Sequence, residues 1–390
     1  MKKYSLAHDT ISRKEIVSLN KWLLKGERLT KGKLTLKFEN QFSKYINRKY
    51  SLFVNSGSSA NLLMLSALIE SDKLKNKKAI VAGVSWSTTL SPFIQNNFDI
   101  ELCDCSNKDL GIDIAHFELL CKKHKPSIAI MVDVLGHPNN FKEIKKLCKK
   151  YNVILLEDTC EALGTVLYGK KLGTAGLASS FSFYYGHHIT TIEGGMVCCS
   201  NQDHYQLLRM FRSHGMTREA SQEVSAAYEK DYPSLNPLFT FALPGFNFRS
   251  TELNAVLGLG QMRKLDSNIQ IRKNNLGRWL KKLDSNKYFT DFAVEGNSNF
   301  ALPLVLNESN KNRLDKVQSL LRKMEVEFRL GTAGGGNLSR QPFVKKSIHK
   351  IADNQTNVDF IHDFGLYVGN GEHVDFEKID VVTEKLNRVE

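Results

Sequence analysis

The fold class is indicated by one short stretch, Val153-Ile-Leu-Leu-Glu-Asp-Thr-Cys-Glu161. An apolar run of this kind predicts a strand buried on both faces, with polar side chains where the strand ends. Such a strand delivers Asp158 to its carboxyl end, where open parallel sheets bind their ligands. Two interpretations of Asp158 alone have equal weight. It is either a carboxylate that pairs with the protonated ring nitrogen of a cofactor or a cap of the next helix.

Similar apolar runs recur through the first half of the chain. Amphipathic stretches such as 59–68 and 140–151 lie between them and predict helices. The runs that predict strands are 79–83, 100–103, 127–132, 153–157, 180–184 and 195–199. This alternation predicts an α/β fold with a mixed, mostly parallel sheet flanked by helices.

The second half of the chain has a different pattern. Residues 217–241 are polar, aromatic and weakly periodic, which predicts a long loop or an insertion. A long helical pattern begins at Thr251 and predicts a connection to a smaller α+β domain. We therefore predict a large domain over residues 1–250 and a small C-terminal domain over residues 251–390.

Charge leaves two classes of protein open. The 54 Lys and Arg residues exceed the 41 Asp and Glu residues, which gives a formal charge of +13. This surplus suits either a nucleic-acid-binding protein or a soluble enzyme that has an anionic ligand and a lysine-rich surface. No apolar run approaches the ~20 residues of a membrane span, and no secretory signal precedes the first strand. We therefore expect a cytoplasmic protein with no membrane partner.

The seven cysteines point to the same compartment. Their number is odd, and four of them lie in apolar, strand-like runs, so reduced thiols explain them better than a disulfide framework. No Cys-x-x-Cys pair occurs, and no cysteine follows Cys199. A zinc ribbon or an iron–sulfur cluster is therefore not expected, and we predict no metal site.

Two further stretches carry polar side chains beside predicted strands and helices. The first, Asn55-Ser-Gly-Ser-Ser-Ala-Asn61, precedes an apolar helix. It offers a phosphate cradle of free N–H groups and hydroxyls, or an ordinary cap by Ser58 or Ser59. The second stretch, 180–195, places His187 and His188 between a strand and a double glycine. Histidine in such a loop is an acid/base candidate, and we assign His188 to structure.

Taken in order, these stretches resemble the sugar aminotransferase family, which uses pyridoxal phosphate on nucleotide-linked keto-sugars. The resemblance runs from about Phe38 to the C-terminus. It also rests on the stretches Val84-Ser-Trp-Ser-Thr-Thr89, Pro244-Gly-Phe-Asn-Phe-Arg249 and Glu252-Leu253. It implies the type I fold of pyridoxal-phosphate-dependent transferases, as in aspartate aminotransferase, and a homodimer with active sites at the subunit interface.

One departure from the family pattern bears on the activity. In the aminotransferases, a lysine six residues before Glu193-Gly-Gly195 attaches covalently to the cofactor, whereas this chain has His187 there. Imidazole cannot form that attachment, but it can abstract a proton. The block 185–195, with Trp86 and the stretches 213–218 and 365–370, is similar to a 3-dehydratase branch that acts on GDP-4-keto-6-deoxy sugars. A related CDP-sugar dehydratase also has histidine, but it holds an iron–sulfur cluster on C-terminal cysteines.

The resemblance implies a dehydratase that removes the C3 hydroxyl of a GDP-4-keto-6-deoxy hexose or heptose. Pyridoxal or pyridoxamine phosphate is held non-covalently, and L-glutamate is the amino donor. The products are ammonia and a 3-deoxy-4-keto sugar for 3,6-dideoxysugar and surface polysaccharide biosynthesis. His187 acts first as base and then as acid, which requires a pKa near the working pH, and histidine has one without large tuning.

The same resemblance assigns the cofactor site. His187 is the catalytic residue, and Asp158 pairs with the ring nitrogen. Trp86 stacks on the pyridine ring, its alternative being a core tryptophan, and Glu161 lies near the ring. The cofactor phosphate is held by Gly57, Ser58 and Ser182, together with Asn247 from the partner subunit.

The candidates for sugar or diphosphate contact are basic: His214, Arg218, Arg249 and Arg329. The alternative for His214 and Arg218 is a solvated basic loop, and the alternative for Arg249 and Arg329 is a set of surface salt bridges. The stretch 331–337 departs from the proline-containing stretch that the family has after Arg329, so the sugar stays open between hexose and heptose.

Two rival functions remain. One is a sugar aminotransferase with an unusual base. The other is a basic nucleic-acid-binding regulator, although the chain lacks a helix-turn-helix pattern and an aromatic-interleaved basic stripe.

Overall fold

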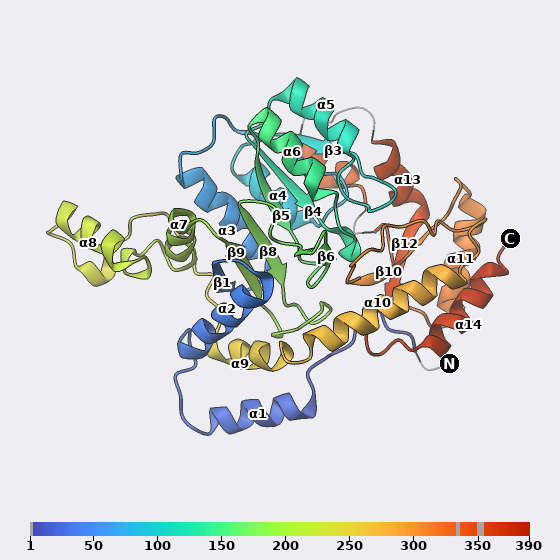
Figure 1. The fold of residues 1–390 in the computed structure, drawn as a ribbon, viewed down its shortest axis with the longest axis horizontal. Coiled ribbons are helices and arrows are strands. Elements are labelled where there is room, and N and C mark those ends of the chain that lie inside the picture. Colours follow the sequence, from blue (N-terminus) through green and yellow to red (C-terminus); the bar gives the residue numbers. More distant parts are fainter. Residues whose placement is uncertain (1–2, 333–335, 349–354) are drawn as a thin grey trace.

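The computed structural model describes residues 3–332, 336–348 and 355–390. Its centre is a seven-stranded sheet (Figure 1). In spatial order the strands are β1 (Tyr50–Val54), β9 (Gly195–Cys199), β8 (Ala178–Ser182), β5 (Ile154–Asp158), β4 (Ile128–Val132), β2 (Lys78–Ala82) and β3 (Asp99–Cys103). Neighbours from β8 to β3 are parallel, whereas β9 is antiparallel to both of its neighbours. The predicted mixed, mostly parallel sheet is confirmed.

The sequence missed one strand of this sheet, β1. Ser51 interrupts the apolar run of β1, so the sequence pattern does not predict a buried strand there. The structure buries Ser51 at 3% exposure, because its hydroxyl accepts a hydrogen bond from Ser43 at 2.8 Å. The polar side chain is satisfied inside the core, which sequence periodicity cannot anticipate.

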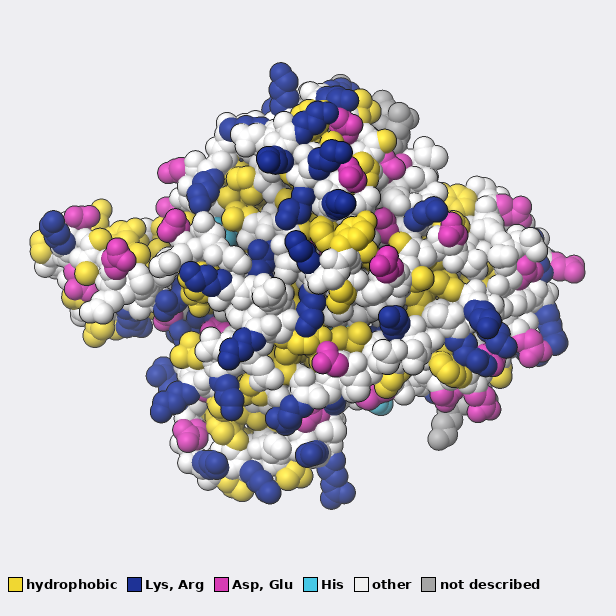
Figure 2. Space-filling model, viewed as in Figure 1, with side chains coloured by type: hydrophobic (Ala, Val, Ile, Leu, Met, Phe, Trp, Pro, Cys, Tyr) yellow, Lys and Arg dark blue, Asp and Glu magenta, His cyan; other side chains and the backbone are white. Residues whose placement is uncertain are grey.

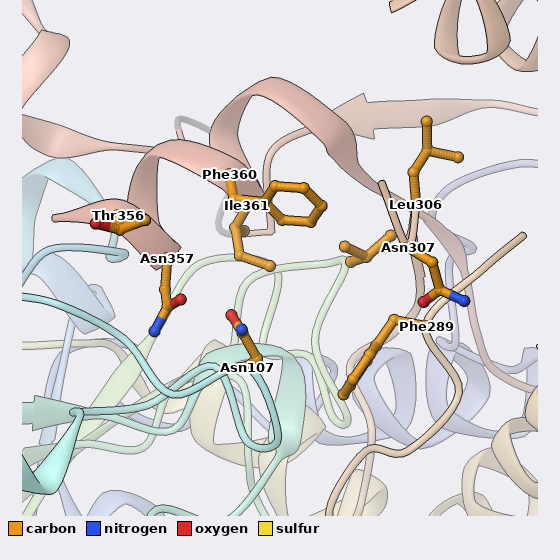
Figure 3. Close-up of a pocket in the computed structure, with 9 residues that line it drawn as sticks. Asn107, Phe289, Leu306, Asn307, Thr356, Asn357, Phe360 and Ile361 are labelled. Carbon is orange, nitrogen blue, oxygen red and sulfur yellow. The ribbon is translucent and has the colours of Figure 1, made fainter. Parts of the chain in front are cut away.

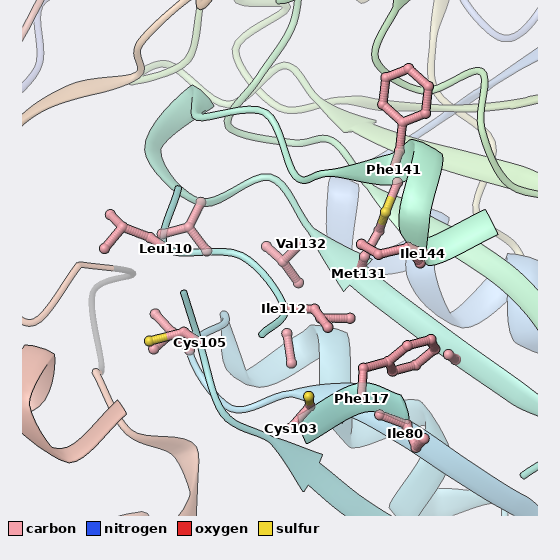
Figure 4. Packing of buried hydrophobic residues seen from close by; sticks show 14 of the residues in the cluster. Ile80, Cys103, Cys105, Leu110, Ile112, Phe117, Met131, Val132, Phe141 and Ile144 are labelled. Carbon is pink, nitrogen blue, oxygen red and sulfur yellow. The ribbon is translucent and has the colours of Figure 1, made fainter. Parts of the chain in front are cut away.

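Helices cover both faces of the sheet. On one face lie α5 (Ile114–His124) and α6 (Phe141–Tyr151), which pack onto a cluster that includes Ile80, Phe117 and Met131 (Figure 4). On the other face lie α3 (Gly57–Glu70), α4 (Ser87–Gln95) and α7 (Gln202–Arg212). Both faces are therefore buried, as the continuous apolar strands predict.

A smaller antiparallel sheet lies toward the C-terminus. Its strands, in spatial order, are β10 (Ala301–Val305), β12 (Gly365–Gly369) and β11 (Phe328–Leu330). The helices of this half are α10 (Leu265–Lys282), α11 (Lys311–Lys323), α12 (Pro342–Ser347), α13 (Thr356–Phe364) and α14 (Phe376–Asn387). Its core also includes Tyr4, whose hydroxyl donates to the carbonyl of Gly369 at 2.8 Å.

The predicted domain division at residue 250 stays a prediction, but two segments cross it. Tyr4 belongs to the core of the C-terminal sheet. The helix α9 (Glu252–Gln261) packs instead against α1 (Arg13–Leu23) and α2 (Lys33–Ile46) beside the large sheet. Glu252 fixes this contact, because its carboxylate accepts hydrogen bonds from the N–H groups of Gly32, Leu34 and Thr35 at the start of α2.

Residues 217–241 form an arm that projects from the body of the molecule (Figure 1). The predicted loop or insertion holds a helix, α8 (Gln222–Asp231), between short turns at Thr217–Glu219 and Pro237–Phe239. Ser221 begins α8, since its side chain accepts from the N–H of Val224. The last elements are the short paired strands β6 (Val166–Leu167) and β7 (Lys170–Lys171).

On one face of the molecule the positive charge is dispersed (Figure 2). On the face in Figure 2, Lys and Arg side chains are scattered among acidic ones rather than gathered in a stripe. All seven cysteines are free thiols, and six of them are buried. Within the described part of the chain, no helix is both long and apolar enough to cross a membrane.

Candidate active site

The start of α3 meets the end of β8 very closely. A Cβ atom added to Gly57 would lie 2.8 Å from Cβ of Ser182 and 3.0 Å from Sγ of Cys160. Only glycine fits here, so the first N–H groups of α3 stand next to the Ser182 side chain. Ser58 lies beside them, with its hydroxyl 2.8 Å from that of Thr88. Free N–H groups and hydroxyls at a helix N-terminus suit a phosphate.

Asp158 lies next to this cradle, at the carboxyl end of β5, and is 4% exposed. Its Oδ2 accepts hydrogen bonds from the Asn61 side chain at 2.8 Å and the Thr89 hydroxyl at 2.7 Å. Its Oδ1 accepts the N–H of Cys160 at 3.2 Å. Oδ2 is thus held by two neutral donors, while Oδ1 keeps room for another donor.

Glu161 follows on the same loop and faces a strained turn. Its Oε2 accepts the N–H of Leu135 at 2.7 Å, and Leu135 has a left-handed backbone with φ of 52°. Left-handed leucine is costly and is retained where the surrounding structure requires it. Burial raises the pKa of Glu161 to about 8, and the charge of Asp158 adds to this effect.

His187 lies on the loop between β8 and β9. Its ring is 5.0 Å from the ring of Phe300, and its Nδ1 is buried with no hydrogen-bond partner among the residues that the structure describes. Burial lowers the pKa of His187 to about 4; the charge of Arg272 acts in the same direction, and that of Asp158 opposes it. The sequence-based expectation of a pKa near the working pH therefore differs from what the fold sets, because the fold encloses part of the imidazole, including Nδ1, away from water. His188 is fully enclosed, with Nε2 2.8 Å from the carbonyl oxygen of Ser298.

Trp86 occupies the N-cap position of α4 and is 55% exposed. Two neighbours on this helix, Thr88 and Thr89, contact Ser58 and Asp158 respectively. The ring thus stands at the edge of the site and not in the core, which is the position expected of a side chain that covers a bound ring.

A second group collects three of the remaining candidates. Arg249 donates from Nε to the Asn247 side chain at 3.0 Å, and its Nη2 lies 3.1 Å from Nε2 of His214. Asn247 is exposed and bonds here to Arg249. His214 has a left-handed backbone with φ of 63°, a conformation that is uncommon outside glycine.

The other two basic candidates lie apart from this group. Arg218 is on the projecting arm, with its guanidinium 5.1 Å from the centre of the Phe239 ring. Arg329 is exposed on β11, opposite Tyr367 on β12. Burial raises the pKa of Tyr367; the charge of Glu161 adds to this rise and that of Arg329 opposes it, so both charges act on this phenol. Residues 333–335 of the stretch after Arg329 lie outside the described residues.

Sequence reasoning missed several residues of the site. Asn61, Thr88 and Thr89 stand inside stretches that had been singled out, but nothing in the sequence assigned them to Asp158 or Ser58. Nothing in the sequence indicates that Phe300 and Arg272 belong to the site, because more than 80 residues separate them from His187 and only the fold brings them together.

A separate cavity of about 270 Å³ lies beside α13 (Figure 3). Its lining combines amide side chains with apolar ones: Asn107, Phe289, Val305, Leu306, Asn307, Thr356, Asn357, Phe360 and Ile361. None of these belongs to the predicted site. Among the residues that the structure describes, no cluster of three His, Cys, Asp or Glu side chains is placed to bind a metal ion.

Similarity to known proteins agrees with this geometry. A GDP-4-keto-6-deoxy-D-mannose 3-dehydratase of Yersinia pseudotuberculosis is 34% identical over 373 residues, 94% of each chain. A crystal structure of GDP-4-keto-6-deoxymannose-3-dehydratase with a trapped PLP-glutamate geminal diamine superposes with a TM-score of 0.89 at 31% identity, covering 98% of this chain and 100% of that one. The structure of a histidine-to-asparagine variant of the same kind of enzyme, with bound GDP-perosamine, superposes with a TM-score of 0.90 at 30% identity and with the same coverage.

The family assignment rests on nearly the whole chain. The sequence model of the DegT/DnrJ/EryC1/StrS aminotransferase family matches residues 10–387, which include every predicted site residue. The sheet order, the glycine at the start of α3 and the carboxylate at the end of β5 are all in place. The chain therefore belongs to the DegT/DnrJ/EryC1/StrS aminotransferase family.

Proposed function

We propose that this chain is a 3-dehydratase that uses pyridoxal or pyridoxamine phosphate to act on a GDP-linked 4-keto-6-deoxy sugar. The observation that carries the proposal is the position of His187, where an aminotransferase of this family has its cofactor-bound lysine. The charged groups that shift the pKa of His187 are Arg272 and Asp158, with no lysine among them. The similar dehydratase structures support the same substrate class and L-glutamate as amino donor.

The described residues fit a pyridoxal phosphate molecule. The cradle at Gly57, Ser58 and Ser182 would hold the phosphate. Asp158, with one oxygen still available, would accept the N–H of the ring nitrogen, and the exposed Trp86 would cover the ring. When bound, the cofactor supplies an electron-poor ring that stabilises the charge left by a broken C–H bond.

The chain's own residues then move the proton. With a pKa of about 4, the His187 imidazole is unprotonated at pH 7, so its lone pair is free to take a proton, but it is a weaker base than an ordinary histidine. We assign the transfer to Nε2, because Nδ1 is buried. The imidazolium so formed is a stronger acid than usual, since its surroundings disfavour charge, and it protonates the departing C3 hydroxyl. A base without a covalent link to the cofactor favours elimination over amino transfer.

The site is completed, we propose, by a second copy of the chain. Large apolar side chains are exposed on α1 and just after it, where Ile16 is 51% and Leu24 81% exposed. The arm exposes more of them: Tyr232, Leu235, Leu238, Phe239 and Phe241. Exposed apolar surface of this extent is typical of an interface. Such a homodimer would bring Asn247 to the partner's cofactor phosphate.

Mixing two inactive variants tests the shared site. His187→Asn removes the base, and Asn247→Ala removes the contact assigned to the partner. If the site is shared, an equal mixture after subunit exchange recovers about a quarter of the wild-type activity, because half of the dimers are mixed and each has one intact site. If both residues serve the same chain's site, the mixture recovers nothing, and the shared site is wrong.

We place the protein in the cytoplasm, since seven free thiols suit a reducing compartment. The activity itself is tested by incubation with a GDP-4-keto-6-deoxy sugar, pyridoxal phosphate and L-glutamate. Ammonia and a C3-deoxygenated sugar are expected, and His187→Asn should abolish both. A borohydride-reduced lysine–cofactor adduct would instead identify an aminotransferase. Hexose and heptose substrates should be compared side by side; the role in surface polysaccharide synthesis stays a prediction.

A further inference from the structure

Arg272 is buried without a carboxylate partner. This residue of α10 is 5% exposed, and no described acidic side chain forms an ion pair with it. Burial lowers its pKa to about 10, so the guanidinium stays charged at pH 7. A buried charge that is not paired must be satisfied by hydrogen bonds. Those bonds show what the residue does.

Among the described residues, the guanidinium donates only to backbone carbonyls. Nη1 donates to Phe300 at 2.7 Å, Asn370 at 2.9 Å and Asn299 at 3.4 Å. Nη2 donates to the carbonyl of His187 at 3.5 Å. One planar group therefore joins α10, the segment before β10, the end of β12 and the loop that carries the proposed base.

Two of these bonds bear on the position of the His187 ring through the backbone. One holds its own peptide, and another holds the peptide of Phe300, whose ring packs 5.0 Å from the imidazole. The linkage continues, because the N–H of Phe300 donates to Leu135 at 2.9 Å and the N–H of Leu135 donates to Glu161. One buried cation is therefore linked by hydrogen bonds to two residues of the site, His187 and Glu161.

We propose that Arg272 is a positioning residue for His187, which fixes the imidazole from behind through its own carbonyl and through Phe300. This inference rests on the proposed role of His187 as base. The charge of Arg272 also holds the imidazole in its neutral form, after the larger effect of burial. A base that is both fixed and neutral is ready to accept a proton.

Other described groups also lie near His187, among them the backbone of Cys160, whose hydrogen bond raises the pKa of His187. Asp158 at the end of β5 acts against Arg272, and His188 and Tyr184 come from the same loop. Glu372 and His373, in the segment after β12, lie within electrostatic range of Arg272 itself. Of these groups, Arg272 is the one permanent cation, so replacing it changes the field at His187 in a defined direction.

The test uses two variants and a matched control on the same helix. Arg272→Met removes both the charge and the hydrogen-bond donors of the guanidinium. Arg272→Lys keeps a charge, but its single ammonium group cannot reach all four carbonyls. The control is Asn275→Ala, one turn along α10. Asn275 is 2% exposed and bonds Asn370, Gly371 and Val374, but neither His187 nor Phe300.

The first readout is independent of catalysis. Histidine labelled with ¹³C at Cε1 is titrated by NMR in the cofactor-free protein, and the His187 signal is assigned by its loss in His187→Asn. Arg272→Met should raise the His187 titration midpoint by about one pH unit, while Asn275→Ala leaves it unchanged. In Arg272→Lys the midpoint stays low, but the chemical shift of the His187 signal changes because the ring is no longer fixed.

The second readout is kinetic. Arg272→Lys should lower kcat for dehydration at least about ten-fold with the KM for the nucleotide sugar unchanged, and Asn275→Ala should change kcat much less. If Arg272→Lys keeps both the wild-type chemical shift of His187 and wild-type kcat, the proposal is wrong, whether or not Arg272→Met folds. The NMR result stands even if the dehydratase assignment itself fails, so the two failures are distinguishable.

Discussion

The side-chain N–H of Asn61 reaches Asp158 across the start of α3 and bonds its Oδ2 at 2.8 Å. The Thr89 hydroxyl donates to the same oxygen at 2.7 Å. Asn61 is itself fixed, because its Oδ1 accepts the hydroxyl of Ser180 at 2.6 Å. Residues from α3, α4 and β8 therefore orient one carboxylate of β5. The direction of that carboxylate is a property of the whole sheet edge and not of the loop that carries it.

Removing the hydroxyl at position 89 should weaken cofactor binding. Thr89→Val keeps the shape of the side chain but takes one donor from Asp158. A hydrogen bond to a charged group contributes about 1.5–3 kcal/mol, so we expect the Kd for pyridoxal phosphate to rise roughly 10- to 150-fold. Absorbance titration of the cofactor-free protein measures it. Ser91→Ala on the same helix, which loses only a bond to the carbonyl of Ser87, should bind as the wild type does.

Closing the cradle should have a comparable effect by a steric route. In Gly57→Ala the new Cβ would lie 2.8 Å from Cβ of Ser182, so one of the two segments must shift. We expect cofactor affinity to fall at least about ten-fold, or about 1.4 kcal/mol. Gly277→Ala is the matched control, because Gly277 is exposed in α10 and nothing lies within 4 Å of its added Cβ.

The control makes a prediction of its own. Gly277→Ala should leave cofactor binding unchanged and should raise the free energy of unfolding by about 0.5–1 kcal/mol, because alanine favours a helix interior. Urea denaturation measures the change. Equal cofactor binding by Gly57→Ala and Gly277→Ala would contradict the phosphate cradle.

The buried ion pair between α2 and α7 should dominate the stability of that side of the sheet. Arg212 and Glu39 lie 2.7 Å apart at 2% and 5% side-chain exposure, and Glu39 also accepts the N–H of Phe53. Arg212→Met leaves a buried carboxylate uncompensated, so unfolding should become easier by about 3–5 kcal/mol. Removing the exposed Arg388 from its pair with Glu384 should cost less than about 1 kcal/mol. Urea midpoints of the two variants give the comparison.

Asp133 should make stability depend on pH. It is fully buried at the end of β4, and burial, aided by the charge of Glu157, raises its pKa from 3.8 to about 8. The folded state therefore keeps a proton that the unfolded state loses above about pH 4, so this contribution to stability falls as pH rises toward 8. Asp133→Asn removes the titration.

Urea denaturation should show that the free energy of unfolding of Asp133→Asn rises relative to that of the wild type between pH 5 and pH 7. The slope of the difference is at most about 1.4 kcal/mol per pH unit. All other titrating groups are common to both proteins, so the difference isolates Asp133. A difference that stays constant across this range would mean that Asp133 is ionised in the folded protein.

The sequence by itself determined the sheet, most of its strands and the order of the chemical groups along the chain. Apolar runs of strand length are buried in the sheet whatever their position in the chain. Residues 153–161 alone predict a carboxylate at the end of a strand. Gly57 and His187 can also be identified without any structure. Gly57 stands in a stretch of small residues before a predicted helix, and His187 stands six residues before Glu193, where the family has lysine.

Only the tertiary structure decided how these groups are held and charged. The side-chain donors to Asp158 come from two other elements, α3 and α4, and the guanidinium behind His187 comes from a helix 85 residues further along the chain. A pKa of about 4 for His187 follows from burial, which depends on the sum of all packed neighbours. Periodicity reports which face of an element is apolar, whereas contact between distant elements and the loss of water exist only once the chain has folded.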